Sequence, residues 1–307
     1  MIRRQWMALG MMTCTLGLFA APGEAASKLR VVTTITDLKA LTEAVGGNLV
    51  EVESLARGNQ DPHNVDLRPS LMLKVRRADL IVMVGLELEP WVEGMIMGSN
   101  NGNLAPGGPG RVVVSQGIPV MELPQVQVDR SMGDVHPFGN PHFTLDPGLA
   151  PIITSNILQG LARLAPEQRT IFEKNRQEFL DRLAAAQSQW TKVLEPYRGS
   201  KIVVFHSTSI YFLTRFGLVQ AATVEDRPGI PPSPAHLAAV IRLMKDQRIK
   251  VILIDPWLDR AIAERAAEEA GARVVVQAGL VGAVKSTDDS YFETIAYNVN
   301  ALAQALK

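Results

Sequence analysis

The chain has 307 residues, of which 47% are apolar, and its 31 Lys and Arg residues balance its 31 Asp and Glu residues. A net charge of zero does not favour nucleic acid or an anionic membrane surface as a partner. The length suffices for two lobes of ordinary domain size, each with its own core.

The N-terminal segment has the composition of a secretory signal peptide. A basic start is followed by a short apolar run and then by small residues. This pattern predicts a signal peptide over residues 1–26, cleaved near Ala25 or Ala26, and a periplasmic protein. Cys14 lies inside the apolar run, but the residues before it fit a lipoprotein cleavage site poorly. Cleavage would remove this only cysteine, so a metal would have to bind imidazole or carboxylate.

Beyond residue 27, short β-branched runs alternate with amphipathic helical patterns, which is typical of parallel sheets covered by helices on both faces. The first series of predicted strands is 30–34, 50–55, 80–84 and 111–114, with helices at 37–45, 69–77 and 148–164. A glycine-rich piece, 100–110, is expected to be a surface loop. The second series has strands at 202–205, 220–223, 251–254 and 274–276, with helices at 209–216, 234–247, 260–270 and 289–306.

A long helix is predicted between the two series, opened by Pro166 and ended by Pro196. Its apolar residues fall on one helical face. They are Phe172, Phe179, Leu183, Ala186, Trp190 and Val193. At 1.5 Å per residue the helix would be roughly 40 Å long, so it either covers one domain or joins two lobes. We expect an α/β fold of two parallel-sheet lobes joined by one rigid helix: an N-terminal lobe over 27–165, the helix over 166–195 and a C-terminal lobe over 196–307.

Three short passages place histidines in candidate sites. Residues 139–147 read Gly-Asn-Pro-His-Phe-Thr-Leu-Asp-Pro, so His142 lies between two prolines. Proline restricts its own φ and pushes the preceding residue towards extended geometry, so a stiff loop is expected. A stiff loop pre-orders a metal ligand and lowers the entropy cost of binding. A similar Asp-Pro-His-Asn run at 61–64 contains His63, and His206 follows a predicted strand.

Ligands of open parallel sheets bind beyond the carboxyl ends of the strands. His63, His142 and His206 all lie in such loops, so they could face one cleft between the lobes. Converging neutral imidazoles suit Zn²⁺ well, and Mn²⁺ less well because it prefers oxygen. Loop histidines are often only solvated, so the spacing alone leaves shared metal binding open.

Two further histidines remain in the chain. His136 precedes His142 by six residues and is either an auxiliary ligand or an ordinary loop residue. His236 lies in the first turn of a helix for which Ser233 is a plausible cap, so we expect a surface or packing role.

Several of these passages resemble one family in order along nearly the whole chain from residue 27. Segments 61–70, 140–147, 206–218, 225–234 and 291–298 look like the solute-binding proteins of bacterial zinc and manganese ABC importers, the TroA-like cluster A-I group. The resemblance implies two lobes, a rigid connecting helix and a metal in the cleft. It assigns ligand roles to His63, His142 and His206. Manganese-selective members commonly have a carboxylate at the third position, so His206 favours zinc.

One departure from the family concerns the fourth ligand, often an Asp or Glu in the loop after the last strand. Here that loop, 277–283, contains no carboxylate. Water or a carboxylate from elsewhere would complete the site, and the candidates are Glu225, Asp255, Asp288 and Asp289. Asp289 is also a plausible helix cap.

The leading hypothesis is therefore a monomeric periplasmic receptor, not an enzyme, that captures Zn²⁺ and delivers it to the membrane permease of an ABC importer. Mn²⁺ is the second metal. A zinc-dependent hydrolase could use the same histidines with an activated water, but it needs a general base, and no His-Glu-x-x-His motif supplies one. A receptor for a small organic ligand or a metal chelate is the third possibility, which would be expected to use aromatic or arginine contacts.

Overall fold

The computed structural model describes residues 28–126, 128, 132–287 and 290–307. The described part contains two four-stranded sheets, ordered β2-β1-β3-β4 and β6-β5-β7-β8, and every strand pair is parallel. The predicted pair of parallel sheets is therefore confirmed. The predicted signal peptide, residues 1–26, and the candidate ligands Asp288 and Asp289 lie outside the described residues.

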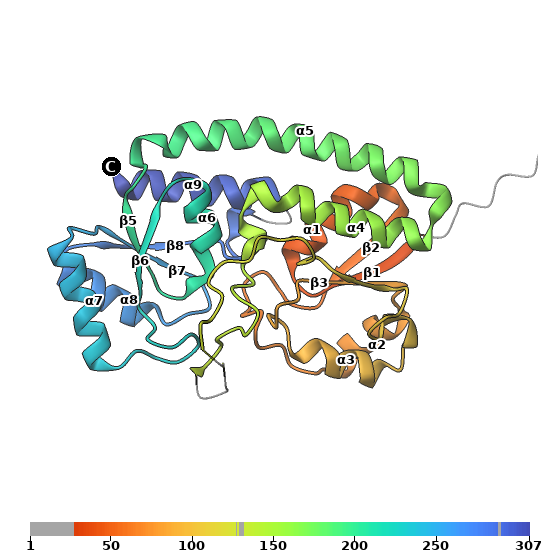
Figure 1. Ribbon diagram of the computed structural model, residues 1–307, viewed down its shortest axis with the longest axis horizontal. Coiled ribbons are helices and arrows are strands. Elements are labelled where there is room, and N and C mark those ends of the chain that lie inside the picture. The colour runs from red at the N-terminus through yellow and green to blue at the C-terminus, as the bar shows by residue number, and fades with distance from the viewer. Residues whose placement is uncertain (1–27, 127, 129–131, 288–289) are drawn as a thin grey trace, which may run out of the picture.

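The N-terminal sheet is covered on both faces, as Figure 1 shows. Its strands are β1 (Leu29–Thr33), β2 (Val50–Ser54), β3 (Leu80–Met83) and β4 (Arg111–Val113). Its helices are α1 (Thr36–Gly46), α2 (Pro69–Arg77), α3 (Trp91–Ser99) and α4 (Ala150–Leu164). α1 packs with α4 on one face and α2 packs with α3 on the other. β3 is apolar and buried along its whole length, as a central strand of a parallel sheet should be.

The C-terminal sheet repeats this order. Its strands are β5 (Lys201–Val204), β6 (Val219–Thr223), β7 (Val251–Ile254) and β8 (Arg273–Val276). Its helices are α6 (Ile210–Arg215), α7 (Pro234–Asp246), α8 (Arg260–Ala270) and α9 (Tyr291–Leu306). Ser233 caps α7 as predicted, and Gly271 ends α8 in a left-handed conformation. α9 begins two residues later than predicted, with Ser290 as its cap.

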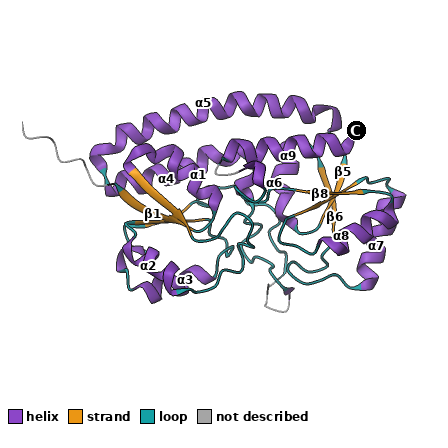
Figure 2. Cartoon of the chain, turned by 180° about the vertical axis from the view of Figure 1, so that it is seen from behind, coloured by secondary structure: helices purple, strands orange, loops and turns teal. Residues whose placement is uncertain are grey.

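The connecting helix α5 (Arg169–Leu194) runs along both lobes and contacts α1 and α4 of one and α9 of the other (Figures 1 and 2). Neither α5 nor any other helix in the described residues is both long and apolar enough to cross a membrane. The predicted buried face is wrong at Val193, which is 39% exposed, while Leu194 is buried. Eleven residues make slightly more than three full turns, so Leu194 lies nearly in line with Leu183. The buried face comprises Phe172, Phe179, Leu183, Trp190 and Leu194.

The region between β3 and β4 contains a helix that was not predicted from the sequence. Helix α3 includes two glycines, which lower helix propensity. Gly94 lies beside Leu67 of the loop before α2, and Gly98 lies beside Met72 of α2. The predicted surface loop over 100–110 is largely exposed, although it contains a short 3-10 turn, Gly102–Leu104, whose Leu104 is fully buried.

Buried polar contacts join the two lobes. Asp37 of α1 accepts hydrogen bonds from the Thr144 hydroxyl at 2.6 Å and from the backbone N–H of Val281, in the loop after β8, at 2.7 Å. Burial raises the pKa of Asp37 to about 6, and these two hydrogen bonds oppose the rise. The Tyr291 hydroxyl of α9 also donates to the Thr144 carbonyl. These contacts favour small movements between the lobes.

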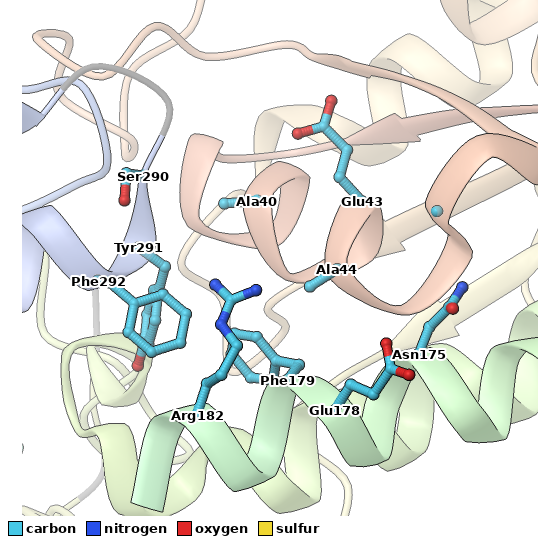
Figure 3. A pocket seen from close by; sticks show the side chains of 11 residues that line it. Ala40, Glu43, Ala44, Asn175, Glu178, Phe179, Arg182, Ser290, Tyr291 and Phe292 are labelled. Carbon is cyan, nitrogen blue, oxygen red and sulfur yellow. The ribbon is translucent and has the colours of Figure 1, made fainter. Parts of the chain in front are cut away.

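A pocket of about 390 Å³ lies where α1, α5 and α9 meet (Figure 3). The guanidinium carbon of Arg182 on α5 lies 4.9 Å from the centre of the Phe292 ring on α9, a cation–π contact. Phe179 packs edge-on against the same ring. This pocket is a seam in the packing of the connecting helix, and its lining includes no histidine.

Candidate metal centre

Three histidines from separate loops converge in the structure. His63 lies in the loop after β2, His142 begins a 3-10 turn (Phe143–Leu145), and His206 follows β5. One ring nitrogen from each lies within 4.8 Å of the others. The ring centres are 5.1 to 5.4 Å apart. The predicted convergence in space is therefore confirmed.

Asn140 holds the loop of His142 in place. Its Oδ1 accepts from the backbone N–H of His142 at 2.9 Å, and its Nδ2 donates to the Ser207 carbonyl and to Glu122 Oε2. Ser207 is next to His206, so one buried amide ties the loops of two cluster histidines together. The sequence pattern predicted a stiff loop but did not indicate this role for Asn140 or Glu122.

The His63 ring is oriented by a carboxylate two residues earlier. Its Nδ1 donates to Asp61 Oδ1 at 2.8 Å, and its backbone N–H donates to the same oxygen at 2.9 Å. Burial acts to raise the pKa of Asp61, but the hydrogen bonds and charge of His63 and the Asn64 amide outweigh it and lower the pKa to about 2. Asp61 is therefore ionised at neutral pH. A proton held on Nδ1 leaves the Nε2 lone pair of His63 available to a metal.

His206 has an equivalent partner in Glu225, from the loop after β6. Its Nδ1 donates to Glu225 Oε2 at 2.8 Å, and the backbone N–H of Gly229 donates to the same oxygen at 2.9 Å. Burial acts to lower the pKa of His206, but the hydrogen bond and charge of Glu225, with smaller effects of Asp255 and Asp134, raise it overall. Of the roles considered for Glu225, the structure therefore favours that of a partner that orients a histidine.

His142 is the most deeply buried member of the cluster. Its Nε2 has no hydrogen-bond partner among the described residues, which is unusual for a buried ring nitrogen. Burial lowers the pKa of His142 well below its ordinary value, and the neighbouring histidines lower it further. The ring is therefore neutral at physiological pH, which is the state that binds a metal.

Asp255 was another candidate for the fourth ligand, and the structure places it in a different network. Its carboxylate accepts from the Thr208 hydroxyl and the Gln277 side-chain amide, both at 2.8 Å. Burial raises the pKa of Asp255 to about 6, against the effect of these hydrogen bonds and of the nearby histidines. A side chain on Gly279 would overlap Asp255 and Trp257, so the loop after β8 passes close to this carboxylate.

The remaining two histidines differ from each other. His136 joins the cluster: its Nε2 lies 3.2 Å from Nε2 of His63, and the two rings stack. His236 does not, since its Nε2 contacts the Thr223 carbonyl at 3.0 Å and its Nδ1 lies 3.6 Å from Asp226. The predicted packing role of His236 is thereby confirmed.

Two hollows give access to the cluster. One of about 210 Å³ is lined by His136, His142 and His206. The other, of about 450 Å³, is lined by His63 and His136. The arrangement is a site that fits an ion, with converging imidazoles, two of them oriented by carboxylates.

Comparison with known proteins agrees with this fold. A family model described as "ZnuA: Zinc-uptake complex component A periplasmic" matches residues 31–305. The high-affinity zinc uptake system protein ZnuA of Bacillus subtilis (strain 168) is 24% identical over 318 residues, 99% of this chain and 98% of that protein. The crystal structure of a ZnuA deletion mutant with zinc bound is 26% identical, with a TM-score of 0.74 over 91% of this chain and 96% of that one.

The solute-binding protein FpvC of Pseudomonas aeruginosa, in complex with Mn²⁺, has the same fold, with a TM-score of 0.78 and 22% identity over 91% of this chain and 99% of that one. The expected architecture of two lobes and a connecting helix is therefore found in solved structures. The family match spans both lobes and the helix between them. The chain belongs to the ZnuA family, the periplasmic component A of zinc-uptake complexes.

Proposed function

We propose that this protein captures Zn²⁺ between its lobes through His63, His142 and His206 and delivers it to the membrane permease of an ABC importer. The observation that carries the proposal is the approach of one ring nitrogen from each histidine to within 4.8 Å of the others. Tetrahedral zinc binds imidazole nitrogen at about 2.0 to 2.1 Å, so small side-chain movements would bring all three into its coordination sphere.

Zinc is favoured over manganese by the donor set. The three ligands assigned here are imidazole nitrogens, which suit Zn²⁺, whereas Mn²⁺ prefers carboxylate and water oxygen. The two carboxylates nearest the rings, Asp61 and Glu225, are hydrogen bonded to Nδ1 atoms. They act as orienting partners, and Mn²⁺ remains a weaker alternative ligand.

The transport role follows from the family, whose members are components of uptake complexes rather than enzymes. The hydrolase alternative therefore finds no support, and the convergence of imidazole nitrogens favours a metal ion over an organic ligand. We propose further that residues 1–26 are removed on export, that the periplasmic receptor works as a monomer, and that its lobes and linker follow the boundaries 27–165, 166–195 and 196–307.

Metal titration of four variants tests the ligand assignment. His63→Ala, His142→Ala and His206→Ala should each weaken zinc binding severely in a competition with a chromophoric chelator, while His236→Ala should bind like the wild type. Competing Zn²⁺ against Mn²⁺ on the wild type should leave zinc bound. Near-native zinc affinity in all three cluster variants would overturn the assignment.

A further inference from the structure

The 132–137 segment places a fourth imidazole against the three-histidine cluster. His136 Nε2 lies 3.2 Å from His63 Nε2, and its ring centre lies 5.2 Å from that of His63 and 6.0 Å from that of His142. Resting on the function proposed above, the geometry points to His136 as a fourth nitrogen ligand of the bound metal. The site would then hold Zn²⁺ with four imidazoles, three from one lobe and one from the other.

The distance between the two Nε2 atoms fits a shared metal. Zinc–nitrogen bonds of about 2.0 to 2.1 Å in a tetrahedron place neighbouring ligand nitrogens about 3.3 to 3.4 Å apart. The 3.2 Å between His63 and His136 is close to that edge. His136 flanks His63 and His142, so completing the tetrahedron requires its ring to turn towards His206.

The positions of the ring protons on His63 and His136 are also compatible with a shared metal. The Asp61 carboxylate holds the proton of His63 on Nδ1, so Nε2 of His63 has a lone pair. In the absence of metal, His136 can donate its Nε2 proton to that lone pair. The backbone of Glu87 is a second hydrogen-bond partner of the His136 ring. Metal binding would replace the bridging proton, with the remaining proton of His136 on Nδ1.

The fold holds the segment of His136 in place across the two lobes. The backbone N–H of Asp134 donates to the Pro228 carbonyl at 2.8 Å, in the loop that also contains Gly229. Gly133 has φ +77°, and a side chain there would overlap the Pro228 carbonyl; Gly229 has φ +74°, and a side chain there would overlap Asp134. The close approach therefore requires glycine on both sides, and it fixes His136 beside the cluster.

Within the described residues, the two carboxylates considered as a fourth ligand are already hydrogen bonded elsewhere. Glu225 is hydrogen bonded to His206, and Asp255 to Thr208 and Gln277. A fourth nitrogen would increase the preference for zinc over manganese, because each exchange of an oxygen donor for imidazole favours the softer ion.

Two substitutions separate a ligand from a merely structural side chain. His136→Ala removes both the possible metal ligand and the hydrogen-bond donor to His63. His136→Gln keeps an N–H donor for His63 and removes only the imidazole. Both variants should weaken zinc binding by more than about 10-fold in competition with a chromophoric chelator, because loss of an outer-shell partner alone typically costs about 10-fold to 100-fold and a direct ligand is removed here. The loss of Mn²⁺ affinity should be smaller. His236→Ala is the matched control, because that histidine lies outside the cluster.

X-ray absorption of the zinc-loaded proteins gives a count of coordinated imidazoles. We expect four in the wild type and in His236→Ala, and three with one lighter ligand in His136→Gln. Thermal unfolding without metal should show that His136→Gln is folded. Wild-type affinity and an unchanged imidazole count in His136→Gln would overturn the fourth-ligand inference while leaving the proposed function intact. If His63→Ala also bound zinc like the wild type, the proposed function itself would fail.

Discussion

Replacing Glu225 by Gln should weaken zinc binding, because it removes the negative charge that supports the His206 ring. Glu225 is 5% exposed, and its Oε2 accepts from His206 Nδ1 at 2.8 Å and from the Gly229 N–H at 2.9 Å. Glutamine has nearly the same shape, and its carbonyl oxygen can accept both hydrogen bonds. The substitution therefore changes the charge with little change in packing.

The expected loss follows from the effect of that charge on the opposite ring nitrogen. A carboxylate on Nδ1 makes Nε2 a more basic ligand, and removing such a partner typically costs about 10-fold to 100-fold in metal affinity. This corresponds to about 1.4 to 2.7 kcal/mol of binding free energy. We expect the lower half of this range if glutamine keeps the ring orientation.

The pH dependence of zinc affinity is a second and more specific test of the role of Glu225. Glu225 is the main group that raises the pKa of His206 against the lowering effect of burial. In the wild type, protons therefore compete with zinc for His206 at a higher pH than in Glu225→Gln. As the pH falls from about 8 to about 5.5, the zinc affinity of the wild type should begin to fall at a higher pH than that of Glu225→Gln. The difference in zinc affinity between the two proteins should therefore become smaller.

Competitive titration at several pH values measures both effects. Asp226→Asn is a suitable control, because that neighbouring carboxylate lies 3.6 Å from His236, outside the cluster, and is exposed. It should bind zinc like the wild type throughout. Equal affinities of Glu225→Gln and the wild type at about pH 8, or a difference that stays constant with pH, would refute the reasoning.

Three other predictions concern stability. Asp37→Ala should lower the free energy of unfolding in urea by about 2 to 4 kcal/mol, since it strands the buried Val281 N–H and Thr144 hydroxyl; a loss below about 1 kcal/mol would contradict this lobe contact. Glu89, in the loop after β3, accepts hydrogen bonds from the Thr34 hydroxyl and the Val84 N–H, and burial raises its pKa from 4.5 to about 7 against their effect. Its contribution to the free energy of unfolding is therefore fully present below about pH 4.5 and is lost as the pH rises through about 7. The free energy of unfolding should therefore fall less steeply between about pH 5 and pH 8 in Glu89→Gln than in the wild type. The same pH dependence in both proteins would contradict this prediction. Zinc at 100 times its Kd should stabilise the protein by about 2.7 kcal/mol, reversed by a chelator; an unchanged unfolding midpoint would show that the folded state does not bind zinc.

Most helices and strands were predictable, because their signals are local. The apolar run of β3 and the Gly271 stop of α8 are each encoded within a few residues. Helix α3 was not predicted; its glycines oppose helix formation, and its position is set by packing beside Leu67 and Met72. The last turn of α5 was assigned to the wrong face for a similar reason, since packing selects Leu194 over Val193.

The sequence indicated which residue types form the site but not which of them contact one another. His63, His142 and His206 stood out through their prolines and their places after strands. Asp61 was visible only as a neighbour of His63, although an acid two residues before a histidine can reach its Nδ1. Glu225 lies 19 residues from its partner, and His136 lies 73 residues from His63, so no local pattern could assign their contacts.

The sequence by itself determined where the imidazoles sit along the chain and that stiff loops present them, because proline geometry and strand ends act over a few residues. Only the tertiary structure decided which of the five histidines meet. That outcome depends on how two separately folded sheets are held against each other by α5 and by buried contacts such as Asp37 with Val281. A metal site between lobes is set by rigid-body packing, and a displacement of a few ångströms there would separate the same residues without changing any local pattern.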